Sequence, residues 1–223
     1  MRAPAGVLLA ALAVPAAAAG QIPNAVVVLE VFGRVHPDDV PESAPPRFVL
    51  LEDGQVFAGG SRRLAAGRLS PAEAKALDRR LAEVRKLPGL SGTVRFGGGE
   101  GRQRLLLRRG RPLDMTVLGD PGQAAPAWRP LAALLEDLSR FDHPSLRPYA
   151  PASYAVSARE ATLPGGCRSW PFPESPAESV FAPRTLPGDS LRDWPSGASP
   201  AVVCAGDKSY IVTFRPLLPG ERP

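Results

Sequence analysis

The sequence predicts an α+β fold, with a mainly antiparallel sheet covered by two helices and a proline-rich C-terminal β extension pinned by a disulfide. Short β-branched runs are separated by turn residues, and two longer segments carry apolar residues at helical spacing. In addition, residues 144–223 contain 14 prolines against 6 in residues 47–143. We therefore expect an α+β domain over residues 20–143 and an extension with short strands over residues 144–223.

The N-terminal residues 1–19 have the features of a secretory signal peptide. Arg2 supplies a positive start, Val7–Val14 form an apolar run, and Ala16–Ala19 offer small residues for cleavage. The run is shorter than the about 20 residues that span a bilayer, and no later segment approaches that length. We expect a secreted or periplasmic protein without a transmembrane segment in the mature chain, and without a lipid anchor because no cysteine lies near Gly20.

The predicted domain begins with strands. Val26–Val35 is a β-branched run typical of a buried strand, and the apolar runs Arg47–Glu52 and Gln55–Ala58 flank an Asp53-Gly54 pair. Asp-Gly between two apolar runs favours a hairpin in which both turn residues have positive φ.

Two helices are expected to cover this sheet. Ser70, Pro71 and Glu73 form the capping box "SPAE", and the helix ends before Pro88-Gly89. Its apolar positions, spaced by three and four residues, are Ala74, Leu77, Leu81 and Val84. The second helix is expected over Ala127–Phe141, with Pro130 in its first turn and apolar positions Leu131, Leu134, Leu135 and Leu138.

Further strands are expected between the helices. Thr93–Phe96 and Gln103–Arg109 are predicted to pair as a hairpin around "GGGEG", continued by Arg111–Leu118 across a turn at Gly110. The stretch "FGGGEGRQ" lacks the Gly-Lys-Ser/Thr of a phosphate loop and the third glycine of a dinucleotide fingerprint. It therefore predicts a hairpin tip, and no cofactor.

Cys167 and Cys204 are the only cysteines of the chain. Export and an even count predict a disulfide between them. The alternative is a metal pair, but His36 and His143 are remote in sequence and no CxxC spacing exists. The strands expected around this bridge are Tyr154–Ser157, Ala201–Cys204 and Tyr210–Phe214.

The basic charge does not by itself indicate nucleic acid. The net charge of +5 comes from 24 Arg and 3 Lys, and it includes Arg2, which leaves with the signal peptide. Nucleic-acid surfaces combine clustered basic residues with aromatic stacking platforms, whereas this chain is 6% aromatic and its arginines are spread out. We expect no nucleic-acid partner.

One short stretch suggests an enzyme. Residues Gly188–Leu191 spell the motif of the GDSL-type (SGNH) hydrolases, in which the serine, here Ser190, needs a histidine base. The resemblance covers four residues, Pro187 precedes them instead of an apolar strand, and no histidine lies downstream. A turn in a loop rich in Gly and Pro explains the same letters.

A dense run of arginines suggests a second kind of site. Arg102 and Arg104 share one face of the predicted strand, and the run comprises Arg102, Arg104, Arg108, Arg109 and Arg111. Such a face would receive an anionic ligand, such as a phosphorylated or uronic-acid surface polymer. The alternative is a solvated edge that resists aggregation.

The other chemistry-bearing residues are sparse. His36 with Asp38 and Asp39, and Asp142 with His143, do not resemble a metal site. The tryptophans would act as sugar-stacking platforms or as core residues; they are Trp128, Trp170 and Trp194.

Three stretches together resemble a group of uncharacterised exported bacterial proteins, often lipoproteins. They are "FVLLEDGQVFAGG", "RLSPAEAKALDRRLAEV" and "YIVTFRPLLPGE". The shared features are a D-G hairpin, an S-P-x-E helix and a C-terminal RPLLP. The resemblance implies a fold and no known activity, and the absence of a cysteine for lipid attachment is a departure from many of those proteins.

No triad, metal cluster or cofactor loop can be assembled from these residues. We therefore expect a non-enzymatic binding or interaction protein of the cell envelope or the extracellular space, with an unknown partner. The alternatives are a secreted esterase using Ser190 and a binder of an anionic envelope polymer through the arginine-rich hairpin.

Overall fold

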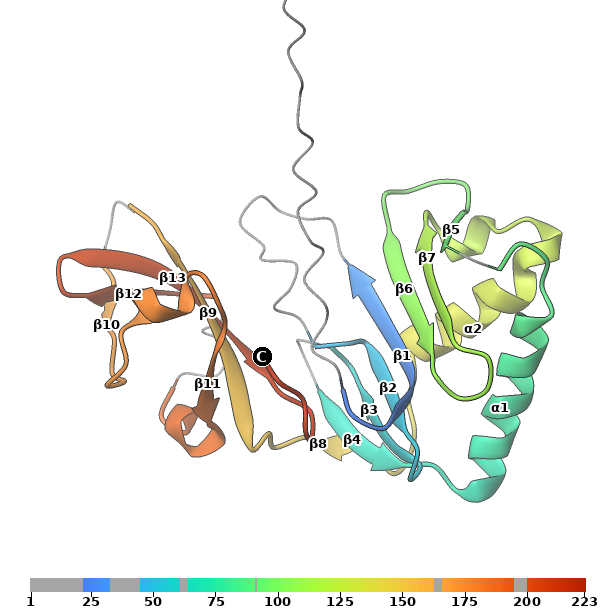
Figure 1. Cartoon of the computed structure of the whole chain (residues 1–223), viewed down its shortest axis with the longest axis horizontal. Coiled ribbons are helices and arrows are strands. Elements are labelled where there is room, and N and C mark those ends of the chain that lie inside the picture. Colours follow the sequence, from blue (N-terminus) through green and yellow to red (C-terminus); the bar gives the residue numbers. More distant parts are fainter. Residues whose placement is uncertain (1–21, 33–44, 61–63, 91, 163–165, 195–199) are drawn as a thin grey trace, which may run out of the picture.

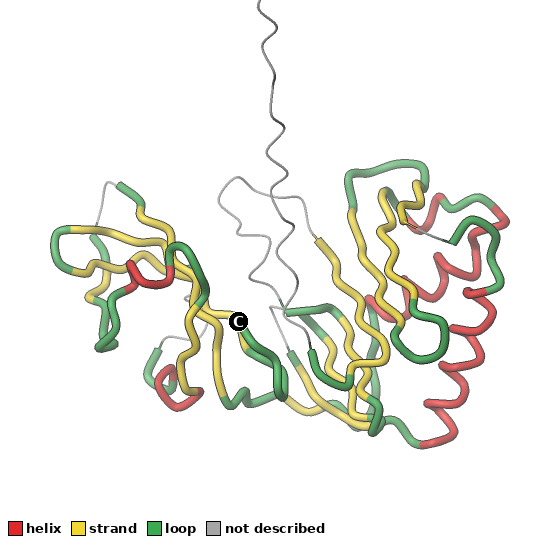
Figure 2. Tube along the Cα trace, viewed as in Figure 1, coloured by secondary structure: helices red, strands yellow, loops and turns green. Residues whose placement is uncertain are grey.

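The described residues form an α+β structure with two sheets and two α-helices (Figures 1 and 2). This computed structural model describes residues 22–32, 45–60, 64–90, 92–162, 166–194 and 200–223. The expected signal peptide, His36, Asp38 and Asp39 lie outside these residues. No helix of the described ranges is long and apolar enough to cross a membrane.

The first sheet has eight strands in the order β5-β7-β6-β1-β2-β3-β4-β8. All neighbouring strands in it run antiparallel except β5 and β7, which are parallel. The strands are β1 (Ala25–Phe32), β2 (Phe48–Leu51), β3 (Gln55–Ala58), β4 (Ala65–Arg68), β5 (Gly92–Arg95), β6 (Arg102–Leu107), β7 (Leu113–Leu118) and β8 (Arg147–Pro148).

The hairpin expected around Asp53-Gly54 is confirmed as β2 and β3, but its turn differs from the prediction. Gly54 has φ +84°, whereas Asp53 is not among the residues with positive φ. The Gly54 N–H donates to the Leu51 carbonyl at 3.1 Å, and the Asp53 carboxylate accepts from the Gln55 N–H at 2.9 Å. The turn therefore begins two residues before Asp53, and only the glycine occupies the left-handed region.

The hairpin expected between Thr93–Phe96 and Gln103–Arg109 is wrong, because β7 lies between β5 and β6. The glycine-rich loop therefore passes over the end of β7 to connect β5 with β6, and it does not form a tight hairpin turn. At this crossing a Cβ on Gly119, which has φ +97°, would lie 2.4 Å from the Phe96 carbonyl oxygen, so only glycine fits. The turn at Gly110 does join β6 and β7 as an antiparallel hairpin, as expected.

Both helices pack against the same face of this sheet. Helix α1 (Pro71–Arg85) has the expected capping box, with the Ser70 hydroxyl accepting from the Glu73 N–H. Helix α2 (Arg129–Ser139) starts later than predicted because a 3₁₀ turn, Pro126–Trp128, precedes it. The two helices and the sheet share one apolar cluster, to which the helices contribute Leu77, Leu81, Val84, Leu131, Ala132, Leu134, Leu135 and Leu138.

The second sheet has five strands in the order β10-β12-β13-β9-β11. Its strands are β9 (Ser153–Glu160), β10 (Arg168–Ser169), β11 (Arg184–Pro187), β12 (Ala201–Ala205) and β13 (Lys208–Pro216). The predicted disulfide is confirmed: Cys167 and Cys204 are bonded, with Cα atoms 5.5 Å apart. Immediately after Cys167, β10 runs parallel to β12, so the bridge holds this short strand at the edge of the sheet.

The C-terminal segment joins the two sheets. Leu218 lies in an apolar cluster with Val49 and Phe57 of the first sheet, on the face opposite the helices. The Tyr149 hydroxyl donates to the Leu217 carbonyl at 3.0 Å. The segment is fixed by a buried ion pair between Arg215 and Glu221, described below. The RPLLP sequence thus has a structural role in the contact between the sheets.

Candidate functional site

Ser190 lies in an exposed 3₁₀ turn, Gly188–Leu191, that follows edge strand β11. The neighbouring Asp189 is ion-paired with Arg192 at 2.8 Å, and a Cβ on Gly188 would lie 2.3 Å from the Pro151 carbonyl oxygen. His143 is bonded elsewhere, and within the described ranges no imidazole is hydrogen-bonded to Ser190. The local residues therefore explain the motif as a turn packed against the start of β9.

His143 connects two residues that the sequence did not bring together. Its Nδ1 lies 2.7 Å from the Ser145 hydroxyl and its Nε2 lies 3.0 Å from a Glu73 carboxylate oxygen. Serine, histidine and acid in this order resemble a nucleophile, a base and an orienting group. The array was missed because Glu73 precedes His143 by 70 residues and lies on another element.

The surroundings of Ser145 indicate a structural role. Its hydroxyl accepts from the Arg68 N–H at 3.0 Å and lies 3.1 Å from the Arg68 carbonyl oxygen. A Cβ on Gly67 would lie 2.5 Å from the same hydroxyl. The oxygen is thus held against the backbone of β4 by its contacts with Arg68, which favours a structural role for Ser145.

The hydrogen bonds of this array indicate where its protons lie. The Ser145 N–H donates to His143 Nδ1 at 3.2 Å, so the proton of a neutral imidazole lies on Nε2 and faces Glu73. Hydrogen bonds from the Ser70 hydroxyl, from His143 and from the Ser70 N–H lower the pKa of Glu73 to about 2. The array therefore ties the N-terminal end of α1 to β4 through a carboxylate that stays charged.

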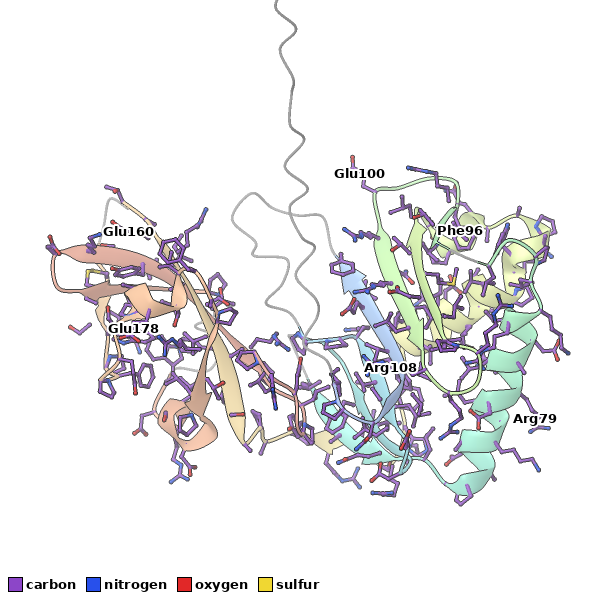
Figure 3. The ribbon with its side chains drawn as sticks, in the orientation of Figure 1. Arg79, Phe96, Glu100, Arg108, Glu160 and Glu178 are labelled. Carbon is purple, nitrogen blue, oxygen red and sulfur yellow. A yellow bond between two sulfur atoms is a disulfide. The ribbon has the colours of Figure 1, made fainter. Side chains whose placement is uncertain are left out.

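Most of the predicted arginine-rich hairpin is occupied by internal contacts. Arg104 makes two hydrogen bonds to Asp114, at 3.0 and 2.7 Å. The Arg108 side chain donates to the Ile22 carbonyl at 2.8 Å, and Arg109 is ion-paired with Asp78 of α1 at 2.8 Å. Figure 3 shows Arg108 and Glu100 toward opposite ends of β6. The run is therefore not one basic surface, and three of its members stabilise the domain.

The other two members are Arg111, which is exposed, and Arg102, which gains a neighbour that the sequence did not indicate. Because β7 lies between β5 and β6, Leu118 is paired with Arg95 on one side and with Arg102 on the other. Arg102 is in turn paired with Phe32 of β1, and its guanidinium lies 4.9 Å from the Phe32 ring centroid. Both arginines are exposed.

These residues lie on the face of the first sheet opposite the helices, which we call the open face. Strand alternation places Val94, Leu105, Met115 and Val117 in the helix-covered cluster, so their neighbours point to the open face. Its β2–β4 half is apolar and contacts Leu218 and Tyr149. The other half, the charged half, carries Thr93, Arg95, Arg102, Arg104, Asp114, Thr116, Leu118, Phe32 and Glu30.

Glu30 is an unusual member of the charged half, because it is a carboxylate only 7% exposed. Its Oε2 lies 3.6 Å from Arg104 and has no hydrogen-bond partner among the residues that the structure describes. Burial raises the pKa of Glu30, with the Arg104 charge opposing that rise, while hydrogen bonds from Arg104 lower the pKa of Asp114. Arg104 thus lies between two carboxylates whose pKa values are shifted in opposite directions.

The tryptophans are packing residues. Trp128 packs against the helix-covered cluster, and Trp170 and Trp194 pack against the second sheet. The Trp170 ring lies 6.3 Å from the Phe214 ring and is nearly parallel to it, and Trp194 lies 4.9 Å from the same ring. These contacts favour the core interpretation over sugar-stacking platforms. The exposed aromatic of this region is instead Phe181, which is 98% exposed.

No family model, curated protein or solved structure matches this chain. The resemblance to exported bacterial proteins therefore stays a prediction. Within the described ranges, no three His, Cys, Asp or Glu side chains are grouped so that they would hold a metal ion.

Proposed function

We propose that this protein is a secreted or periplasmic, non-enzymatic binding protein that contacts its ligand through the charged half of the open face. The leader-like N-terminus and the Cys167–Cys204 disulfide support an oxidising compartment. The positions of Ser145 and Ser190 support a non-enzymatic role, because one hydroxyl is held by backbone contacts and the other lies in an exposed turn.

The observation that carries the proposal is the contrast within one sheet face. The apolar half packs against the C-terminal segment, whereas Thr93, Arg95 and Arg102 are exposed on the other half. Regular strands hold the Cα atoms of these exposed charged and polar residues in fixed relative positions. Such an arrangement is expected of a binding surface built on a rigid scaffold.

The test is an array of purified bacterial surface polysaccharides, probed with the full mature chain. The variant Thr93→Glu/Thr116→Glu alters the charged half without removing an arginine, and it is expected to lose the signals that the unaltered protein gives. The control Arg79→Glu, which changes an exposed residue of α1 (Figure 3), is expected to keep them. Thermal melts verify that both variants fold. Signals that survive Thr93→Glu/Thr116→Glu would contradict the proposed binding face.

A further inference from the structure

We infer that the ligand of the charged half is an acidic polysaccharide that carries carboxylates on its repeating units, and that Arg95 and Arg102 contact those carboxylates. This inference rests on the proposed function and adds the chemical class of the ligand. It is carried by the pairing of Arg95 and Arg102 with Leu118 from its two sides.

The two guanidinium groups are available for a ligand. Within the described part of the chain no acidic side chain is ion-paired with Arg95 or Arg102, in contrast to Arg104 and Arg109. The stacking of Arg102 on Phe32 restrains its guanidinium plane, while the N–H groups at the edge of that plane stay able to donate. A planar guanidinium with free edges fits the two oxygens of a carboxylate.

The separation of the arginines favours a polymer over a small anion. Two strand spacings separate their Cα atoms, about 10 Å in an ordinary sheet. Each arginine can therefore meet a different anionic group of one chain, and two linked contacts bind more tightly than either contact alone.

The other residues of the charged half favour a sugar over a polyphosphate. The Thr93 and Thr116 hydroxyls and the half-exposed Asp114 carboxylate offer hydrogen-bond acceptors beside the arginines. Sugar hydroxyls donate to such acceptors, whereas the oxygens of a polyphosphate are acceptors and are repelled by Asp114.

The experiment measures binding of oligogalacturonate, a polyuronate, to the full mature chain by calorimetry at several salt concentrations. Arg95→Gln/Arg102→Gln is expected to weaken binding by about tenfold or more and to reduce its salt dependence. The matched control is Arg109→Gln/Arg111→Gln, which removes the same charge from the other end of the hairpin. It is expected to change affinity by less than about twofold, because screening weakens distant exposed charges.

A second polyanion provides a further probe: inorganic polyphosphate is expected to bind more weakly than oligogalacturonate. No binding of oligogalacturonate, equal losses in the two double variants, or tighter binding of polyphosphate would overturn the inference.

The two proposals fail in distinguishable ways. If Thr93→Glu/Thr116→Glu abolishes polysaccharide binding while Arg95→Gln/Arg102→Gln leaves it intact, the carboxylate contacts are wrong and the binding face stands. If neither double variant affects binding, both proposals are wrong.

Discussion

Each of the two sheets buries one of its faces, but different structures cover the two faces. The first sheet is covered by α1 and α2, whose aliphatic side chains fill a single cluster with the strands. The second sheet is covered by loops and 3₁₀ turns, and its cluster contains the aromatic side chains of Trp170, Phe172, Trp194 and Phe214. The segments that cover this sheet are rich in proline, with eight prolines in residues 164–200, and large rings on these segments take the place of helices.

The difference shows where additional constraints are required. Irregular segments lose much conformational entropy on folding and offer few backbone hydrogen bonds in return. The second sheet accordingly has the disulfide at one edge and the Arg215–Glu221 pair near its junction with the first sheet. We expect each region to respond to the loss of its own constraint.

The largest expected effect comes from the junction. Arg215 and Glu221 are both buried, 2.5 Å apart, and Glu221 also accepts from the Leu218 N–H at 2.9 Å. Arg215→Leu leaves the carboxylate of Glu221 buried without its cation, and is expected to lower the free energy of unfolding by about 3–5 kcal/mol in urea titrations. The double variant Arg215→Leu/Glu221→Leu should recover part of the loss. A loss below about 1 kcal/mol, the value of an exposed ion pair, would show that the pair does not hold the junction.

Removal of the disulfide tests the second sheet. Cys167→Ala/Cys204→Ala opens a loop whose ends are 37 residues apart, which is expected to cost about 3–4 kcal/mol through denatured-state entropy. Hydrogen exchange should accelerate in β10 and β12 and stay unchanged in β1. Equal acceleration in both sheets would mean that the two clusters unfold as one unit.

Loss of the helix cap tests the first sheet. Ser70→Ala removes the hydroxyl that accepts from the Glu73 N–H, and is expected to cost about 1 kcal/mol. The fluorescence of Trp128 reports this region, provided that Trp170 and Trp194 are replaced by phenylalanine in both the reference and the variant. A Ser70→Thr variant, which keeps the hydroxyl, should restore most of the stability.

The smallest effect concerns pH. The pKa of Glu73 is lowered from 4.5 to about 2 by Ser70 and His143, so its contribution to stability is present above pH 4.5 and is lost as the pH falls toward 2. Glu73→Gln should flatten the stability curve in this interval. Glu83→Gln removes a carboxylate from the same helix, and it should leave the loss of stability between pH 4.5 and pH 2 unchanged. An unchanged curve for Glu73→Gln would mean that the hydrogen bonds to Ser70 and His143 do not persist in solution.

Local signals in the sequence predicted a large part of the fold. The capping box, the Asp-Gly hairpin and the bridge between Cys167 and Cys204 each depend on neighbouring residues or on a unique pairing, and each is found. The predicted strand Val26–Val35 is found as β1 up to Phe32, and its last residues lie outside the described ranges. Strands β4, β8, β10 and β11 were not predicted, because β8 and β10 have two residues each and β4 (AAGR) and β11 (RTLP) lack the β-branched apolar run of the predicted strands.

Local signals in the sequence predicted less of the candidate site than of the fold. The glycine-rich loop joins β5 to β6, but β7 lies between these two strands in the sheet. Only the long-range pairing of β7 with both strands places Arg95 and Arg102 on either side of Leu118. A similar limit applies to Glu73 and His143, which lie in segments with no local relation. Conversely, the arginine run suggested one basic surface, and the partners that occupy Arg104, Arg108 and Arg109 come from β7, the N-terminal segment and α1.

The most direct test of the proposed binding face is methyl NMR of the mature chain during titration with oligogalacturonate. We expect the methyl signals of Leu118, Thr93 and Thr116 to shift, and those of Leu135 in the helix-covered cluster and of Val180 beside Phe181 to stay unchanged. Shifts confined to residues around Phe181 would contradict it and would place the binding surface on the second sheet.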